Sequence, residues 1–214
     1  MEKINCEVKK TYVIEAVHSK VSKKYLFLKR MFDICFSLII GIICMPVMLV
    51  IALMVRLSSP GTVLYKQERL GIYGKKFNIL KFRTMRENAE ADGAQWAEKD
   101  DDRCTTLGAK LRKYRLDELP QLWNIFVGDM SFVGPRPERE CFYKEFETYI
   151  HGFSNRLTVV PGLTGLAQVS GGYDLLPEEK IVYDMEYIKK RSLWLDFKLI
   201  CKTVMVIFGC KGAR

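Results

Sequence analysis

The sequence has little histidine and no closely spaced cysteine pair. Its two histidines are His18 and His151, and none of its seven cysteines stands in a C-x-x-C arrangement. The spacing that the common zinc modules require is therefore missing. The odd number of cysteines also argues against the disulfide framework of small secreted proteins. We expect reduced, mostly buried thiols in a protein that faces the cytosol.

The sequence has fewer acidic than basic residues. The chain carries 34 lysines and arginines against 25 acids, which gives a formal charge of +9. This excess favours an anionic partner, either nucleic acid, anionic lipid or a phosphorylated substrate. No nucleic-acid-binding motif is found, which argues against the first of these partners. The sequence also lacks internal repeats and low-complexity tracts. Its 214 residues, 49% of them hydrophobic, are sufficient for one folded domain with an appendage.

One long stretch lacks charge altogether. Residues 34–55, ICFSLIIGIICMPVMLVIALMV, form a run of 22 uncharged residues. As a helix this run would extend over roughly 33 Å, enough for a hydrocarbon core of about 30 Å. A buried core helix is the alternative, although the run is long for one. A cleaved signal peptide is disfavoured because the run begins late and lacks a small-x-small cleavage site.

We expect this run to enter and leave the membrane on the same side. Pro46, near its middle, removes a helix hydrogen bond and bends the chain. Lysines and arginines flank both ends, and the positive-inside rule places both flanks in the cytoplasm. We predict a re-entrant helix-break-helix over residues 29–57, between a polar segment 1–28 and a cytosolic domain 58–214. A straight helix that crosses the membrane is the alternative.

The other segments predict a helix-rich α+β fold. Short β-prone pieces interrupted by GIYG indicate a small hairpin within residues 62–85. A helix should begin near Pro120, cover residues 121–127 and end at Gly128. The other predicted elements are helices at 12–21, 107–115, 138–157, 178–190 and 192–208, and loops at 86–103 and 159–172. The amphipathic helix at 192–208 either packs on the core or lies in the lipid interface.

Two adjacent acids, Asp117 and Glu118, stand in the stretch RKYRLDELPQLWNIFVGDMSFVGPRP, residues 112–137. By themselves, acids before a proline at a helix start are good caps that complement the helix dipole. Their neighbours favour a phosphate site instead, because the planar guanidinium of arginine suits phosphate oxygens. The cationic candidates are Arg112, Arg115, Arg136 between its two prolines, and Lys81 and Arg83 in KFRTM.

If this site binds a nucleotide diphosphate, the two acids can divide the chemistry. One carboxylate would attack phosphorus and form an acyl phosphate, as carboxylate nucleophiles do. The other would help to hold Mg²⁺, which neutralises the pyrophosphate and the leaving nucleotide. Both acids are therefore candidate metal ligands. Adjacent side chains on a helix point about 100° apart, which is consistent with two different tasks.

Several motifs together resemble the bacterial sugar transferases, which are monotopic phosphoglycosyl transferases. From about Lys29 to Arg214 they occur in the order KFRTM, LDELPQLWN, GDMSFVGPRPE, PGLTGLAQVSG and SLWLDFK. The resemblance implies that a sugar-1-phosphate passes from a UDP-sugar to polyprenyl (undecaprenyl) phosphate and that UMP is released. This reaction begins exopolysaccharide, capsule, O-antigen or glycan assembly. The resemblance also implies Mg²⁺ as the cofactor and a re-entrant helix on the cytoplasmic face of the bacterial inner membrane. It leaves a homodimer open.

The same resemblance implies roles for single residues. Asp117 matches the nucleophile of the family and Glu118 its acidic partner. Phosphate-contacting positions are matched by Arg112 and Arg136, and polar positions near the active site by Lys81 and Asp184. For Asp184, an acid on the surface of a helix is the alternative.

The sequence departs from the family pattern at three places. Met45 precedes Pro46 where some relatives have serine, and Leu166 stands where tryptophan is frequent. Larger relatives carry further membrane helices upstream, whereas the polar segment 1–28 predicts the short form. Two other functions stay open: a membrane-attached glycosyltransferase that releases UDP, and a basic membrane-tethered module that binds anions. The motifs do not predict which sugar is transferred.

Overall fold

The computed structural model describes residues 11–17, 21–90, 93, 101–171 and 175–208. It is a helix-rich α+β structure, as predicted. In chain order the elements are β1 (Tyr12–Val13), α1 (Lys23–Ser58), β2 (Leu64–Leu70), η1 (Ile72–Gly74), β3 (Lys76–Phe82), α2 (Thr106–Lys113), η2 (Leu116–Glu118), α3 (Gln121–Val127), β4 (Ser131–Val133), α4 (Glu140–Glu147), β5 (Ile150–His151), η3 (Phe153–Thr158), β6 (Gly162–Thr164), α5 (Leu166–Ser170), α6 (Pro177–Lys190) and α7 (Leu193–Phe208).

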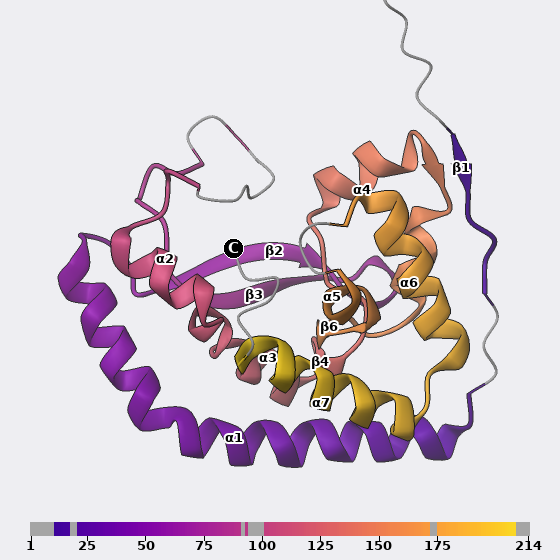
Figure 1. The fold of residues 1–214 in the computed structure, drawn as a ribbon, viewed down its shortest axis with the longest axis horizontal. Helices are drawn as coiled ribbons and strands as arrows, with labels where there is room; N and C mark the ends of the chain where they lie inside the picture. The colour runs from indigo at the N-terminus through magenta and orange to yellow at the C-terminus, as the bar shows by residue number, and fades with distance from the viewer. Residues whose placement is uncertain (1–10, 18–20, 91–92, 94–100, 172–174, 209–214) are drawn as a thin grey trace, which may run out of the picture.

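The uncharged run forms the middle of α1, a helix of 36 residues that begins after the N-cap Ser22. The predicted break at Pro46 is not found, because α1 continues through this proline. Figure 1 shows α1 bent, with its C-terminal part turned toward α2. A proline removes one hydrogen bond and pushes on the preceding turn, which bends a helix without ending it when the neighbouring turns remain intact.

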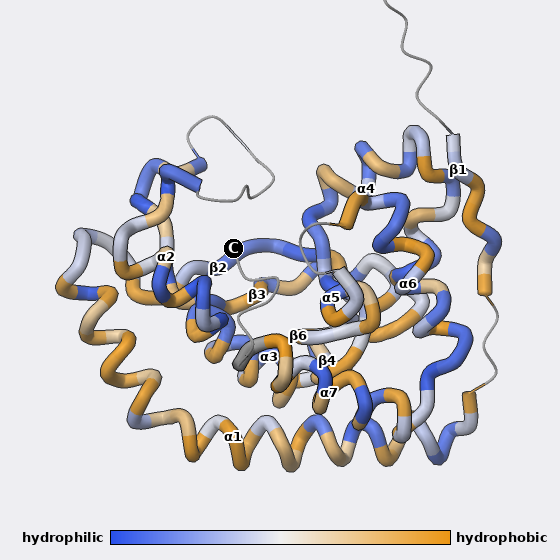
Figure 2. The backbone as a smooth tube through the Cα atoms, viewed as in Figure 1, coloured by the Kyte–Doolittle hydropathy of each residue, from blue (hydrophilic) through white to orange (hydrophobic). Residues whose placement is uncertain are grey.

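Most of α1 lies outside the globular part of the molecule. Only 11% of its most apolar stretch is buried within the structure, and Figure 2 shows it as a largely hydrophobic tube along one side. Its length and composition are sufficient to cross a membrane. The low burial argues against the alternative of a core helix.

Polar side chains near the start of α1 fix it to the globular part. Arg30 donates hydrogen bonds of 2.7 Å to the carbonyl oxygens of Ile125 and Phe126, at the C-terminal end of α3. The buried Asp33 accepts a hydrogen bond of 3.1 Å from the backbone N–H of Phe132 in β4. Charged donors at a helix C-terminus satisfy carbonyls that have no partner within the helix. These contacts hold α1 against the elements that follow the acid pair.

A second polar cluster joins α1 to α6 and α7. The ammonium of Lys29 lies 2.9 Å from a carboxylate oxygen of the buried Asp196 in α7. The hydroxyls of Tyr25 and Tyr187 donate to the same carboxylate at 3.0 and 2.8 Å. The first turns of α1 and α7 therefore meet, as Figure 1 shows.

The predicted hairpin is confirmed. Strands β2 and β3 pair antiparallel from Leu64↔Phe82 to Leu70↔Lys76. The turn between them contains Tyr73 with a φ of 55° and Gly74 with a φ of 76°. Positive φ values are inexpensive only for glycine, so Tyr73 is the strained residue of this turn.

Two short parallel pairs join distant segments. Strand β4 pairs with β6 through Ser131↔Gly162 and Val133↔Thr164. Strand β1 pairs with β5 through Tyr12↔Ile150. The segment for which we predicted an amphipathic helix at 12–21 is thus extended where it is described, and residues 18–20 lie outside the described part. Its apolar residues pack against the core from an extended chain, because β5 offers it backbone hydrogen bonds.

Most of the other predicted helices are confirmed, but one is partly wrong. Helix α3 has the expected bounds, and Gly128 closes it with a φ of 99°. The helices predicted at 107–115, 178–190 and 192–208 are confirmed as α2, α6 and α7. Of the helix predicted at 138–157, only Glu140–Glu147 is found, as α4, because Ile150 and His151 pair with β1. Gly152, with a φ of 91°, then turns the chain into η3. The segment at 159–172 is not merely a loop, since it contains β6 and α5.

The hydrophobic core has two parts. The larger cluster lies between the hairpin, α3, α4, α6 and the start of α7, and its most buried members include Ile125, Ile150 and Ile181. The smaller cluster consists of Ile51, Val55, Phe82 and Leu111, so that the end of α1 packs on the hairpin and on α2. Both ends of α1 are thereby attached to the same globular part.

Candidate active site

A cavity of about 330 Å³ opens between the hairpin, η2, the segment after β4, and α4 to α6. Positive charge dominates its lining, with eleven cationic side chains against four acidic ones. The cations are Arg69, Lys81, Arg83, Arg86, Arg103, Arg112, Arg115, Arg136, Arg139, Arg156 and Lys180, and the acids are Glu87, Glu90, Asp117 and Glu138. A cavity with this charge is suited to a ligand with several negative charges.

The acid pair reaches this cavity through a sharp turn. Helix α2 ends at Lys113, and Arg115 then adopts the left-handed conformation with a φ of 55°. This turn starts η2, which contains both Asp117 and Glu118, and both residues are buried. A non-glycine residue in this conformation costs about 1 kcal/mol or more, and such residues cluster at functional sites.

Glu118 is the paired member of the two acids. Its Oε1 atom accepts a hydrogen bond of 3.0 Å from the ammonium of Lys81 and a shorter one from the guanidinium of Arg136. Burial alone would raise the pKa of Glu118, but the positive charges of Arg136 and Lys81 outweigh burial and hold this pKa well below its usual range. Glu118 is therefore ionised at neutral pH and fixes two cations in place.

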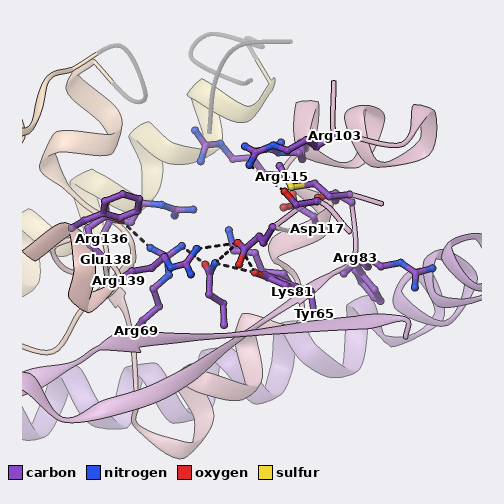
Figure 3. Close-up of a pocket in the computed structure, with 18 of the residues that line it drawn as sticks. Tyr65, Arg69, Lys81, Arg83, Arg103, Arg115, Asp117, Arg136, Glu138 and Arg139 are labelled. Carbon is purple, nitrogen blue, oxygen red and sulfur yellow. Dashed lines mark hydrogen bonds and ion pairs between the residues drawn. The ribbon is translucent and has the colours of Figure 1, made fainter. Parts of the chain in front are cut away.

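Asp117 is the open member of the pair. It lines the cavity, and its carboxylate accepts no hydrogen bond from the described residues. Burial and then the negative charge of Glu118 raise the pKa of Asp117, whereas Lys81, Arg112 and Arg136 oppose this rise. A carboxylate with few hydrogen bonds and a raised pKa is a better nucleophile than a solvated one. Figure 3 shows Asp117 between Lys81 and Arg115 in the middle of the site.

The donor set fits a magnesium ion. Within the described ranges, no group of three or more His, Cys, Asp or Glu side chains is placed to hold a metal. Mg²⁺ does not need such a group, because it is commonly held by one or two carboxylates together with substrate phosphates and water. Asp117 provides the open carboxylate, whereas the Oε1 atom of Glu118 is already occupied by two cations. Asp117 is thus the better candidate ligand of the two predicted ones.

Arg136 is held by its backbone as well as by its side chain. The parallel pair of β4 with β6 continues beyond the strands, with Gly134 N–H donating to Thr164 at 2.9 Å and Gly162 N–H to Pro135 at 2.8 Å. The guanidinium of Arg156 donates to the carbonyl oxygen of Arg136 at 3.0 Å. The residue between the two prolines therefore has a fixed backbone and a side chain directed at Glu118.

Asp184 lies one contact away from this arrangement. It forms a buried ion pair with Arg156, with 2.6 Å between Nη2 and Oδ2 and both side chains 2% exposed. The ring of Phe153 packs 5.0 Å from this guanidinium. Burial raises the pKa of Asp184 to about 6 against the opposing charge of Arg156. Asp184 is neither on a helix surface nor in the lining of the cavity, and it is connected to Arg136 through Arg156.

Two more of the predicted cations, Arg112 and Arg83, line the cavity but have other contacts. The guanidinium of Arg112 lies 2.8 Å from the sulfur of Cys104. Arg83 donates to the carbonyl and hydroxyl oxygens of Ser59 at 2.7 and 2.9 Å, and Figure 3 shows its side chain directed away from Asp117. Arg83 thus connects the end of α1 to the hairpin, whereas Lys81 and Arg136 are brought together with the acid pair.

Comparison with known proteins agrees with this geometry. The family model described as "Bacterial sugar transferase" matches residues 24–210, which include all of α1 except Lys23 and every residue that lines the cavity. The chain belongs to the bacterial sugar transferase family. The resemblance inferred from the ordered motifs is thereby confirmed.

Relatives of this family member are named for different sugars. An Aeromonas hydrophila protein, 43% identical over 193 residues, is named a UDP-N-acetylgalactosamine-undecaprenyl-phosphate N-acetylgalactosaminephosphotransferase. A Caulobacter vibrioides protein, 40% identical over 181 residues, is named a UDP-glucose:undecaprenyl-phosphate glucose-1-phosphate transferase. A Salmonella typhimurium protein, 38% identical over 202 residues, is named an undecaprenyl-phosphate galactose phosphotransferase.

The matches differ in how much of each protein they cover. They include 89%, 82% and 87% of this chain, and 46%, 68% and 42% of the three relatives, respectively. The chain therefore spans about half the length of the Aeromonas and Salmonella relatives. The names agree on the acceptor and differ in the sugar.

The family motifs do not include all the residues that line the cavity of this sugar transferase. Tyr65, Gln67 and Arg69 alternate along β2 and present their side chains to the cavity. A period of two in a predicted strand is the signal that could have identified them. Glu138 and Gln168 do stand in the motifs GDMSFVGPRPE and PGLTGLAQVSG, but the sequence assigned no role to them, and only the fold shows that they line the cavity.

Proposed function

We propose that this chain transfers a sugar-1-phosphate from a UDP-sugar to a polyprenyl phosphate and releases UMP. The observation that carries this proposal is the open, buried carboxylate of Asp117 in a basic cavity, beside a Glu118 that holds Lys81 and Arg136. The names of the relatives support undecaprenyl phosphate as the acceptor. As part of the same proposal, this reaction is the first step in the assembly of a bacterial glycan.

The first half-reaction begins at Asp117. A carboxylate oxygen attacks the β-phosphorus of the UDP-sugar, and the bond from this phosphorus to the bridging oxygen breaks. The bridging oxygen keeps the electron pair and leaves as part of UMP, so that Asp117 carries the phosphosugar. Lys81, Arg112 and Arg136 supply positive charge where negative charge develops. When bound, Mg²⁺ supplies further charge neutralisation at the phosphates, with Asp117 as its candidate ligand.

The second half-reaction releases the enzyme. A phosphate oxygen of the polyprenyl phosphate attacks the same phosphorus, and its bond to the Asp117 oxygen breaks. The products are a polyprenyl diphosphate sugar and the free carboxylate. Because both half-reactions occur at one phosphorus, the same cations serve the donor and the acceptor in turn.

We also propose that α1 enters the inner membrane from its cytoplasmic face and returns to it. Three observations support this orientation: the low burial of α1, the bend that Figure 1 shows, and the attachment of both helix ends to one globular part. On the neighbouring α7, Trp194 and Phe197 are exposed, and aromatic residues favour the interface between membrane and water. This favours an interfacial position for α7.

The central test is the substitution Asp117→Asn. This change preserves shape and removes the nucleophilic charge, so UMP release should fall by about 10³-fold or more. Intact-mass analysis of the wild type with donor but no acceptor should show one phosphosugar adduct, which the variant lacks. UDP instead of UMP among the products would support the glycosyltransferase alternative. A fully active variant would refute the role of Asp117, and a wild type without turnover that still binds anionic vesicles would favour the binding module.

The membrane orientation has its own test. Single cysteines at Lys24 and Lys66, introduced into a cysteine-free protein in inverted vesicles, should react with an impermeant maleimide from the same side. Their reaction from opposite sides would show that α1 crosses the membrane.

A further inference from the structure

One neutral polar side chain in the wall of the cavity has no partner. Gln168 of α5 lines the cavity, and both its amide nitrogen and its amide oxygen are buried without a hydrogen bond within the described part of the chain. A buried polar group left without a partner costs about 1–3 kcal/mol, so such groups are rare in native proteins. An amide that offers both a donor and an acceptor to a cavity fits a ligand group that can do the same.

The backbone around Gln168 keeps this side chain at the wall. A Cβ atom on Gly165 would lie 2.7 Å from the amide oxygen of Gln168 and 2.3 Å from the carbonyl oxygen of Gly134. Glycine is therefore needed at position 165 to let the amide and the segment before Arg136 approach each other. The hydrogen bonds between the segments that follow β4 and β6 place Gln168 on the Arg136 side of the acid pair.

The charges on this side are largely neutralised by nearby acids. Figure 3 shows Arg69, Arg136, Glu138 and Arg139 together, apart from Arg103 and Arg115. The ion pairs there are Arg69–Glu138 at 3.0 Å, Arg139–Glu90 at 3.0 Å and Arg156–Asp184 at 2.6 Å. A wall of paired charges and an unpaired amide is better suited to an uncharged, hydroxylated group than to the phosphates of a nucleotide.

We infer that Gln168 is a specificity-determining residue that hydrogen-bonds a hydroxyl or acetamido group of the donor sugar. This inference rests on the proposed function, since it concerns the sugar of the UDP-sugar donor. A sugar hydroxyl both donates and accepts, as the amide of Gln168 does. The ribose hydroxyls and the uracil ring of the nucleotide share this property, and the UDP-binding measurement separates the nucleotide from the sugar.

The experiment compares Gln168→Leu and Gln168→Glu with Gln67→Leu. Gln67 is the matched control because it lines the same cavity, but its amide already contacts Tyr65 and Glu90, at 2.9 and 3.1 Å. Each protein is tested with UDP-N-acetylgalactosamine, UDP-glucose and UDP-galactose for UMP release. Binding of these donors and of UDP is measured separately in the Asp117→Asn background, where chemistry is blocked.

We expect Gln168→Leu to lower kcat/KM for the preferred donor by about 3- to 10-fold more than for the poorest donor, as loss of a neutral hydrogen bond predicts. UDP affinity should stay within about twofold, a small change on this scale. Gln168→Glu keeps the shape and an acceptor, so it gives a second measurement if the leucine variant does not fold. Gln67→Leu should leave the ranking of the donors unchanged.

Three results would overturn the inference. Equal loss for all donors would show that Gln168 does not contact the differing part of the sugar. Equal loss of UDP affinity would assign Gln168 to the nucleotide. An unchanged ranking in both variants would assign it to neither. If the wild type releases no UMP from any donor, the proposed function fails, whereas the binding measurements still decide whether Gln168 discriminates between sugars.

Discussion

The contact of Arg30 with the end of α3 allows a quantitative prediction. Its guanidinium donates to the carbonyl oxygens of Ile125 and Phe126, both at 2.7 Å. A hydrogen bond to a charged group contributes about 1.5–3 kcal/mol, and Arg30 is only half-buried, so we expect Arg30→Met to lower the free energy of unfolding by about 2–4 kcal/mol in total. For a chain of this length, each kcal/mol shifts Tm by about 2–4 °C, which predicts a loss of roughly 4–16 °C.

The assay is thermal unfolding of the detergent-solubilised protein, followed by circular dichroism. Arg30→Lys should recover about half of the loss, because an ammonium reaches one carbonyl where the guanidinium fork reaches two. Arg56→Met is the matched control, since Arg56 donates to the carbonyl of Gly61 at 3.0 Å in an exposed position. We expect a change of less than about 1 kcal/mol there. If Arg30→Met and Arg56→Met unfold at the same temperature, Arg30 does not hold α1 to α3.

Two further predictions concern titrating groups. Glu118→Gln removes a negative charge that raises the pKa of Asp117, and it frees two cations that lower this pKa. The acid limb of the rate–pH profile should therefore move to lower pH. An unmoved limb would show that the charge of Glu118 does not affect the pKa of Asp117. Asp184 binds its proton more tightly in the folded protein, with a pKa of about 6 against 3.8, so its contribution to stability is present at low pH and decreases as the pH rises from 3.8 to about 6. Asp184→Asn should remove this part of the Tm–pH curve, whereas Glu186→Gln, in an exposed pair of the same helix, should not.

Local signals predicted the elements whose ends are set by nearby residues. Helix α3 has its expected bounds because Pro120 and Gly128 act on the adjacent backbone. Distant partners explain the failures. The segment at Tyr12 has helical spacing but is extended because Ile150 pairs with it across more than half of the chain. The helix predicted at 138–157 ends at Glu147 because Ile150 and His151 pair with the same distant segment.

The residues of the candidate site also divide into those that the sequence predicted and those that only the fold brings together. Asp117, Glu118 and Arg136 are close in sequence and carry an unusual pattern, so their meeting could be anticipated, and the family resemblance added Lys81. The contacts of Asp184 could not be read from the sequence, because only the fold shows that it pairs with Arg156, which in turn contacts Arg136. The partnerless amide of Gln168 is likewise a property of three-dimensional packing.

The attachment of α1 at both ends limits how this protein can be shortened. Removal of the residues before Leu64 to obtain a water-soluble enzyme would take away Ile51 and Val55, and would expose Phe82 and Leu111 to solvent. It would also remove β1, the strand that pairs with β5, and Arg30, the cation that binds the last carbonyls of α3. A truncated version should therefore aggregate rather than fold, and solubilisation should be sought through detergent or nanodiscs with the helix retained.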